Sequence, residues 1–236
     1  DTITINHDGP EFQIKGGPWD GYSLYDLYGE ASTPWEWPEA LFAKARELDI
    51  TMFSTPFDDT AVNFLETLGA PAYKIASFEA IDLPLIGKVA ATGKPMIIST
   101  GMASLSEIAE AIEAAKQGGA KELILLHCIS AYPAPPEESN LRTITDLAAR
   151  FGVDVGLSDH SMGIALPLAA VTLGACFIEK HMTLRRADGG PDGSFPLEPN
   201  EFSNMAEGCR AAWSSLGSAN YDRTEAERGS MVFRRS

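Results

Sequence analysis

Short apolar runs alternate with longer segments of helical periodicity through most of the chain. Four runs cover residues 50–55, 72–77, 95–100 and 123–128, and two more begin at Val153 and Cys176. In the segments between them, apolar residues recur three and four positions apart, as at Leu105, Ile108 and Ile112. The pattern predicts six consecutive βα units, with one helix before them and a final helix around residues 202–216.

The predicted strands are apolar throughout, as expected of parallel strands covered by helices. Their even spacing, and the polar residues at nearly every C-terminal strand end, favour a (β/α)₈ TIM barrel. An open doubly wound sheet is the alternative. Two strands are missing from the count, so we expect a barrel that lacks its first two strands in this chain. Residues 1–34 show no clear periodicity, and we predict an irregular loop region there.

Composition narrows the classes of function. The chain has 236 residues and a net charge of −15, with no basic cluster, which argues against nucleic-acid binding. No run approaches the roughly 18 apolar residues of a membrane span, and the opening does not resemble a signal peptide. The three cysteines are widely spaced and unpaired in pattern, which indicates a reducing compartment such as the cytoplasm.

Polar residues gather where the predicted strands end, which in a barrel is the active face. Lys74 lies inside an apolar strand, and a buried charge there needs an anionic partner. It is a candidate ligand for phosphate or carboxylate, with further hydroxyl donors from Thr55, Ser77 and Ser158. A structural ion pair and a Schiff-base nucleophile are the alternatives for Lys74.

His160 and His181 end the last two predicted strands, which are neighbours if the sheet is parallel. Two imidazoles so placed could ligate a divalent ion, although either one alone is more typical of a hydrogen-bonded core residue. Asp159 could orient its neighbour or contact substrate. His127, inside its strand, is predicted to be buried in packing. Asp192, in a glycine-rich loop, fits either a substrate contact or a plain turn.

Six motifs in order resemble the sialic acid synthase family, whose members condense phosphoenolpyruvate with an acetamido sugar to make nonulosonic acids. They are Phe53-Ser-Thr-Pro-Phe57, Ala72-Tyr-Lys-Ile-Ala-Ser-Phe-Glu79, Lys94-Pro-Met-Ile-Ile-Ser-Thr-Gly101, Leu126-His-Cys-Ile-Ser-Ala-Tyr-Pro133, Gly156-Leu-Ser-Asp-His160 and Glu179-Lys-His181. The segments at residues 14–20, 33–37 and 130–132 look most like the branch that makes pseudaminic acid. The branches that make neuraminate and legionaminate are the alternatives.

The resemblance implies a TIM barrel with a divalent ion, Mn²⁺ or Mg²⁺, on His160 and His181. It implies that phosphoenolpyruvate binds Lys74, Ser77, Thr55 and Ser158, with Ser130 nearby. Tyr132, Glu79 and Asp192 would face the sugar, expected to be 2,4-diacetamido-2,4,6-trideoxy-altrose. The product would be pseudaminic acid.

The resemblance also implies parts that this sequence does not contain. The family has two earlier strands and a C-terminal antifreeze-like domain that caps the partner's site in a homodimer. We therefore expect one partial domain over residues 1–236, with βα units over 35–217 and a linker over 218–236. We also expect little activity from this chain alone. A Schiff-base aldolase using Lys74, and a non-catalytic binding barrel, remain the competing hypotheses.

Overall fold

The computed structural model describes residues 4–7, 9–17, 19–190 and 192–235, and its centre is one parallel sheet. Its strands run in sequence order: β1 (Tyr73–Ile75), β2 (Met96–Ser99), β3 (Leu123–Cys128), β4 (Asp154–Asp159) and β5 (Ile178–Lys180). A doubly wound sheet would reverse its strand order at a switch point, and this sheet has no reversal. The order is that of a barrel segment.

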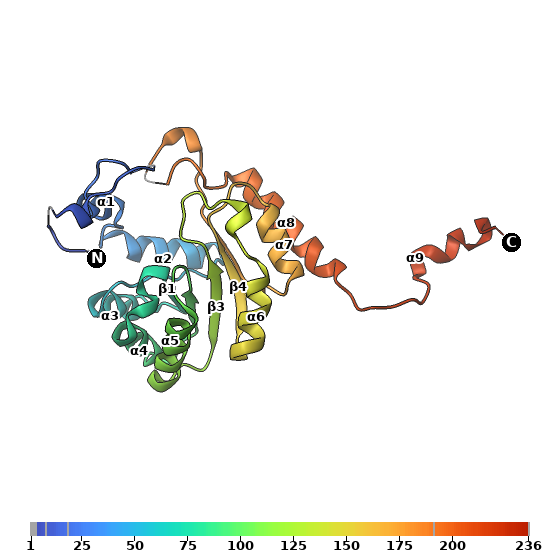
Figure 1. Ribbon diagram of the computed structural model, residues 1–236, viewed down its shortest axis with the longest axis horizontal. Helices are drawn as coiled ribbons and strands as arrows, with labels where there is room; N and C mark the ends of the chain where they lie inside the picture. The colour runs from blue at the N-terminus through green and yellow to red at the C-terminus, as the bar shows by residue number, and fades with distance from the viewer. Residues whose placement is uncertain (1–3, 8, 18, 191, 236) are drawn as a thin grey trace.

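Helices cover the outside of the sheet, as Figure 1 shows. The helices between the strands are α4 (Leu83–Ala90), α5 (Leu105–Gly118), α6 (Arg142–Phe151) and α7 (Ala165–Thr172). Before the sheet come α1 (Leu24–Ala31), α2 (Trp37–Glu47) and α3 (Asp59–Thr67), and after it come α8 (Pro199–Ser215) and α9 (Glu225–Arg228). Within the described residues, none of the helices is long and apolar enough to cross a membrane.

The core lies between the strands and these helices. Tyr73, Ile75, Met96, Ile98 and Leu125 point into it and are almost fully buried. Strand side chains alternate between two faces, so the residues between these positions point to the other, concave face. That face carries the polar residues of the candidate site.

The sheet is strongly curled. In a flat sheet, four strand spacings would separate β1 from β5 by roughly 19 Å. Yet Lys74 Nζ on β1 lies 3.6 Å from Glu179 Oε1 on β5. The first and last strands therefore face each other across the concave side, and the sheet is a half-barrel.

One glycine permits a close backbone approach within this curve. A Cβ built on Gly156 of β4 would lie 2.8 Å from the Leu126 side chain and would also meet the Phe177 backbone carbonyl. No side chain fits there without moving backbone. The glycine of the Gly156-Leu-Ser-Asp-His160 motif is thus required by packing between β4 and its neighbours.

Three local predictions need correction. Residues 50–55 do not form a strand, because Ser54 makes only an isolated bridge to Tyr73, and no described segment pairs with their other side. Residues 1–34, predicted to be irregular, contain α1, which Ser23 begins by accepting a hydrogen bond from Asp26 N at 3.0 Å. The predicted linker over 218–236 contains the short helix α9 and a 3₁₀ turn, Gly229–Phe233.

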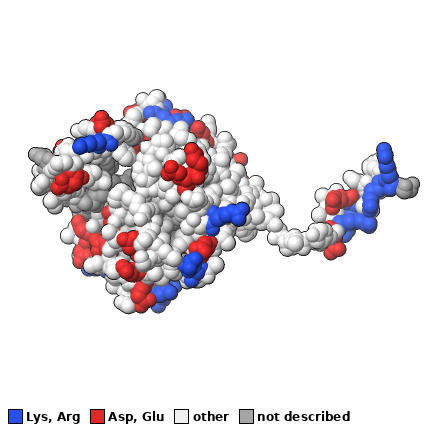
Figure 2. All heavy atoms as spheres, viewed as in Figure 1, with Lys and Arg blue, Asp and Glu red and all other residues white. Residues whose placement is uncertain are grey.

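The C-terminal segment extends away from the body (Figure 1). On the face drawn in Figure 2, acidic side chains are spread over the body, and basic ones are prominent on this segment. Its basic residues include Arg223, Arg228 and Arg234. The acidic surface agrees with the net charge, so any anion site must be positive only locally.

Candidate functional site

The concave face gathers one polar side chain or more from most strands. Lys74 comes from β1, Cys128 from β3, and Ser158 from β4. Glu179 comes from β5, while His160 and His181 follow β4 and β5 directly. Ser158 and His160 are two residues apart, and so are Glu179 and His181. Because strand side chains alternate, the members of each pair lie on one face of the sheet.

Lys74 and Glu179 form the centre of this face. Lys74 is 6% exposed, and its Nζ also donates to the Ile75 carbonyl at 3.1 Å. Ser158 Oγ donates to Glu179 Oε1 at 2.6 Å, so the carboxylate receives both groups on one oxygen. Burial lowers the pKa of the Lys74 ammonium, and the charge of Glu179 opposes that shift. The anionic partner predicted for Lys74 is therefore present within the protein, from the far strand of the half-barrel.

Sequence reasoning did not single out Glu179. Glu179 was noted only as the first residue of the Glu179-Lys-His181 motif. Its position two residues before His181, which places both on one face of a strand, was the signal that could have identified it. Lys180, between them, points to the opposite face and forms an ion pair with Asp159, their charged atoms 2.5 Å apart. Both side chains of that pair are almost fully buried. Asp159 is thus occupied by Lys180 and by Ser161 N, and it does not reach the concave site.

Ser77 and Ser130 meet at Gly101, the residue two positions after β2. Gly101 N donates to Ser77 Oγ at 3.1 Å. A Cβ built on Gly101 would lie 2.7 Å from Ser77 Oγ and closer still to Ser130 Oγ. The structure therefore brings these two predicted hydroxyls together, and a glycine makes room for them.

We expect Gly101→Ala to displace both hydroxyls and to weaken by about tenfold or more the binding of phosphoenolpyruvate, the ligand that the resemblance implies, since each hydrogen bond to a charged group contributes about 1.5–3 kcal/mol. The Michaelis constant for phosphoenolpyruvate, or its dissociation constant by calorimetry, measures this. Gly87→Ala on α4 is the matched control, because its Cβ would meet nothing within 4 Å. Unchanged affinity in Gly101→Ala would remove Ser77 and Ser130 from the site.

The two predicted histidines lie side by side, with ring centroids 5.2 Å apart. The Nδ1 of His160 lies 3.0 Å from the Ile129 carbonyl and 3.8 Å from Cys128 Sγ. The Nδ1 of His181 lies 3.0 Å from Asp192 Oδ2. Each imidazole thus turns the same nitrogen toward a protein oxygen.

This arrangement fits a metal. A proton on Nδ1, donated to the facing oxygen, leaves the lone pair on Nε2, and that tautomer is the one that ligates. No described residue forms a hydrogen bond with either Nε2. Within the described part of the chain, no group of three or more histidine, cysteine or acidic side chains is arranged to hold an ion. A bound ion would therefore take two protein ligands here, with the rest from water and substrate oxygens.

An aromatic wall surrounds the histidines. The Tyr132 ring lies 4.3 Å from that of His160, and the Phe195 ring lies 5.0 Å from that of His181. Trp19 packs against Tyr132 from the N-terminal segment, at 5.6 Å. Burial, and then nearby negative charge, raise the pKa of the Tyr132 phenol, so it remains a hydrogen-bond donor. Phe195 and Trp19 were not predicted, because both lie in loops without periodicity.

Glu79 lies at the edge of the site next to α1. Burial raises the pKa of its carboxyl group, and one of its oxygens, Oε2, is buried with no hydrogen-bond partner among the described residues. Burial and the charge of Glu79 together raise the pKa of Tyr28 on α1. Tyr28 is a further residue that the sequence did not indicate, since α1 itself was missed.

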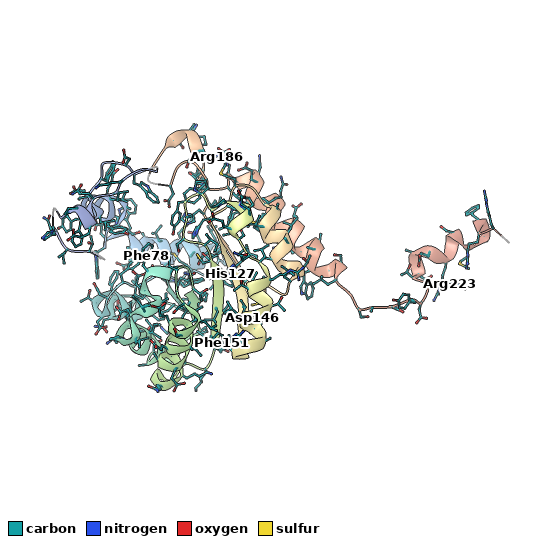
Figure 3. The ribbon with its side chains drawn as sticks, in the orientation of Figure 1. Phe78, His127, Asp146, Phe151, Arg186 and Arg223 are labelled. Atoms are coloured by element: carbon teal, nitrogen blue, oxygen red, sulfur yellow. The ribbon has the colours of Figure 1, made fainter. Side chains whose placement is uncertain are left out.

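Thr55 follows Ser54, which bridges Tyr73, so it lies beside the start of β1. It lines a mostly apolar cavity of about 530 Å³ between α1, α2 and α3, together with Tyr28 and Phe57. No hydrogen bond joins its side chain to another candidate residue in the described ranges. His127, labelled in Figure 3, is buried as predicted. Its Nε2 lies 2.7 Å from the Ser139 carbonyl, and burial lowers its pKa.

Comparison with known proteins identifies relatives over the whole chain. The profile of the NeuB family matches residues 1–221. Pseudaminic acid synthase of Helicobacter pylori is 44% identical over 215 residues, which cover 91% of this chain and 63% of that protein. Pseudaminic acid synthase of Campylobacter jejuni is 43% identical over 236 residues, covering 100% of this chain and 69% of that protein.

A solved structure agrees with these relatives. The N-acetylneuraminic acid synthetase of Leptospira borgpetersenii, crystallised with citrate, superposes with a TM-score of 0.82 at 33% identity. The superposition covers 89% of this chain and 74% of that one. The chain spans somewhat less than two thirds of the length of the Helicobacter relative.

Proposed function

The chain belongs to the NeuB family, and we propose that its concave site serves the condensation of phosphoenolpyruvate with an acetamido-deoxy sugar. The products would be a nonulosonic acid and phosphate. The Lys74–Glu179–Ser158 centre, on the same face as the histidine pair, carries the proposal, because it joins an anion site to a candidate metal site. The names of the relatives favour pseudaminic acid as the product, and the sugar that we propose for this product is 2,4-diacetamido-2,4,6-trideoxy-altrose.

At the anion end, Lys74 binds phosphoenolpyruvate with help from Ser77, Ser130, Ser158 and Thr55. An anion beside Lys74 Nζ competes with Glu179 for the ammonium, and charge-assisted hydrogen bonds favour the doubly charged phosphate. Thr55 is the least supported of the five, since it lines the neighbouring cavity.

At the sugar end, His160 and His181 hold a divalent ion, Mn²⁺ or Mg²⁺. Members of the family are metal-dependent, and the ion would polarise the oxygen of the open-chain aldehyde. Tyr132, Glu79 and Asp192 face this sugar. Carbon 3 of phosphoenolpyruvate attacks the aldehyde carbon, water adds to carbon 2, and the resulting intermediate loses phosphate. Glu179, beside Lys74, is the carboxylate placed to take the proton of that water.

A Schiff-base aldolase is the second candidate, because a buried lysine with a lowered pKa is the nucleophile that such enzymes use. The ion pair with Glu179 opposes it, since the ammonium must lose its proton before it attacks a carbonyl. Borohydride trapping with pyruvate separates the two mechanisms. Labelling of Lys74, with activity that persists in EDTA, would establish the aldolase.

The direct test is a coupled phosphate-release assay on the protein that carries these 236 residues. Phosphoenolpyruvate is offered with the diacetamido altrose sugar, its legionaminate-type epimer or N-acetylmannosamine, each with and without Mn²⁺. We expect metal-dependent release with the altrose sugar. Release only with N-acetylmannosamine would overturn the assigned branch, and no release with any sugar would overturn the condensation.

The proposal extends to the setting of the protein. Its partners are small-molecule substrates, and we infer a homodimer in the cytoplasm, where phosphoenolpyruvate is made.

A further inference from the structure

The loop that follows β5 returns to the strand that it left. Met182 and Leu197 form a parallel bridge. Leu197 N donates to the His181 carbonyl at 2.9 Å, and Thr183 N donates to the Leu197 carbonyl at 3.0 Å. Both ends of the loop are thus tied beside His181, and the loop carries Asp192 and Phe195 back onto that histidine.

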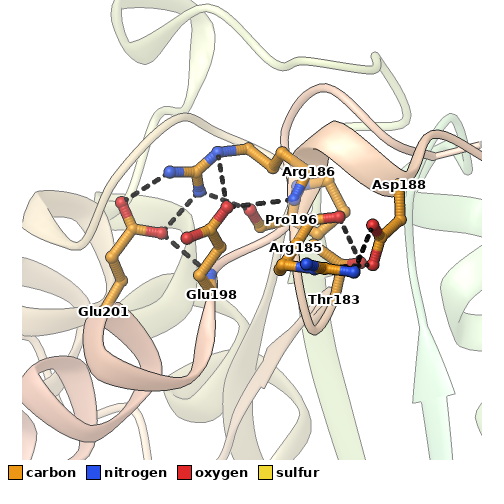
Figure 4. A network of polar contacts seen from close by, with 7 residues as sticks. All are labelled: Thr183, Arg185, Arg186, Asp188, Pro196, Glu198 and Glu201. Carbon is orange, nitrogen blue, oxygen red and sulfur yellow. Dashed lines mark hydrogen bonds and ion pairs between the residues drawn. The ribbon is translucent and has the colours of Figure 1, made fainter.

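One arginine fixes this loop to α8, as Figure 4 shows. The Arg186 guanidinium donates to both oxygens of Glu201, at 2.5 and 3.0 Å. It also donates to the Pro196 carbonyl at 3.0 Å, and Arg186 N donates to Glu198 Oε1 at 3.0 Å. Glu201 belongs to the capping box that begins α8, so the arginine joins both arms of the loop to a helix end. Only a planar fork of donors can make these contacts together.

The neighbouring arginine makes no such connection. Arg185 pairs with Asp188, three residues later, and its side chain is 74% exposed. No described residue of α8 contacts it through a hydrogen bond or ion pair. Arg185 therefore has the same charge as Arg186 and lies in the same loop, so its substitution is a matched control.

We propose that Arg186 is a positioning residue for His181. By holding the loop on α8, it places the Asp192 carboxylate against Nδ1 of His181. That contact selects the tautomer whose Nε2 is available to a divalent ion. The proposal rests on the metal site proposed above for His160 and His181.

A purely structural role for Arg186 gives a different expectation. Its ion pair is about one-third exposed on the arginine side, and such pairs add little to folding stability. Phe195 and Leu197 are each 1% exposed and would keep the loop attached without it. Groups that orient a metal ligand, in contrast, typically change metal affinity 10- to 100-fold when they are removed.

The test compares Arg186→Gln, Asp192→Asn, the double variant and the control Arg185→Gln in the full chain. Long-range ¹H–¹⁵N spectra at pH 8.5 report the tautomer of each neutral imidazole, and with four histidines in the chain each signal can be assigned by substitution. We expect His181 to carry its proton on Nδ1 in the parent and in Arg185→Gln. In Arg186→Gln and Asp192→Asn it should become a mixture of tautomers.

Mn²⁺ binding, followed by electron paramagnetic resonance, is the second measurement. We expect about tenfold weaker binding in Arg186→Gln and no more than a twofold change in Arg185→Gln. The double variant should bind no more weakly than Asp192→Asn alone, because Arg186 acts through Asp192. Arg186→Lys, which keeps the charge without the fork, should lie between the parent and Arg186→Gln.

Two results would overturn the proposal: an unchanged His181 tautomer in Arg186→Gln, or losses that add in the double variant. If Arg186→Gln does not fold, Glu201→Gln tests the same clamp, since Arg186 then retains Glu198 and Pro196. A parent that binds no Mn²⁺, but whose tautomer still follows Arg186, would refute the proposed metal site and leave the clamp standing.

Discussion

His160→Gln should lower metal-dependent phosphate release by about a thousandfold in the protein that carries these residues. The substitution removes one of two imidazole ligands, and a metal acting as Lewis acid contributes several kcal/mol to the transition state. About 4 kcal/mol corresponds to that factor, at 1.36 kcal/mol for each tenfold change. Release is measured at saturating phosphoenolpyruvate, and Mn²⁺ binding is measured separately by calorimetry.

His127→Gln is the matched control for this experiment. His127 is as buried as His160, each with 6% of its surface exposed, but its Nε2 bonds to the Ser139 carbonyl on the other face of β3. It should lower the melting temperature and leave Mn²⁺ affinity unchanged. If His160→Gln kept Mn²⁺ affinity and turnover while remaining folded, the metal site would have to lie elsewhere.

Lys74→Met should lower kcat/KM for phosphoenolpyruvate by about a thousandfold or more. The change removes the cation of the anion site, and it leaves Glu179 without its ammonium partner, facing an incoming anion. Removing one member of a buried pair typically costs 3–5 kcal/mol, so some loss of stability accompanies the loss of binding. Steady-state kinetics and thermal melting together measure both effects.

Second substitutions separate these two effects. Lys74→Met with Glu179→Gln should regain part of the stability, because no buried charge is then unpaired, but it should regain little phosphoenolpyruvate binding. Lys94→Met is the control for a paired lysine, since Lys94 bonds Glu66 at 2.6 Å near the start of β1 and away from the site. Normal affinity in Lys74→Met would contradict the assignment.

The pKa of Lys74 adds a pH dependence to the same prediction. Burial lowers that pKa, and binding needs the charged form, so affinity should fall on the alkaline side at a lower pH than for an ordinary lysine. Lys74→Arg should abolish this alkaline loss, because a guanidinium stays charged. A parent profile flat to pH 10 would argue that the pKa is not lowered in the complex.

Residues on the strands could be predicted from the sequence because strand geometry repeats every two positions. Lys74, Ser158 and His160 each follow an apolar residue or alternate with residues that face the core. Once the strands were recognised, their side chains could therefore be assigned to the opposite, concave face. Glu179 could have been found in the same way. The curl of the sheet, which brings Glu179 to Lys74, is a property of the whole sheet and could not be read from either strand.

Loop residues could not be predicted, since no period constrains them. Asp192 was identified only as a substrate contact or a turn residue, whereas its contact with His181 depends on a loop closed by Arg186. Residues 50–55 have a strand pattern, but pairing needs a second neighbour that the described chain does not supply. The pattern of apolar residues therefore indicated which side chains face the core. The pairing of residues 50–55 and the contact between Asp192 and His181 depend instead on segments far apart in the sequence.

The sequence-ordered sheet has a consequence for how the site is assembled. Each strand pairs with the next one along the chain, so the neighbour that a strand needs is synthesised directly before or after it. The sheet can therefore grow one unit at a time, as the chain leaves the ribosome. Lys74 and Glu179 belong to its first and last strands, so their contact must wait until the whole sheet exists. We expect the reactive centre to be the last part of the half-barrel to form.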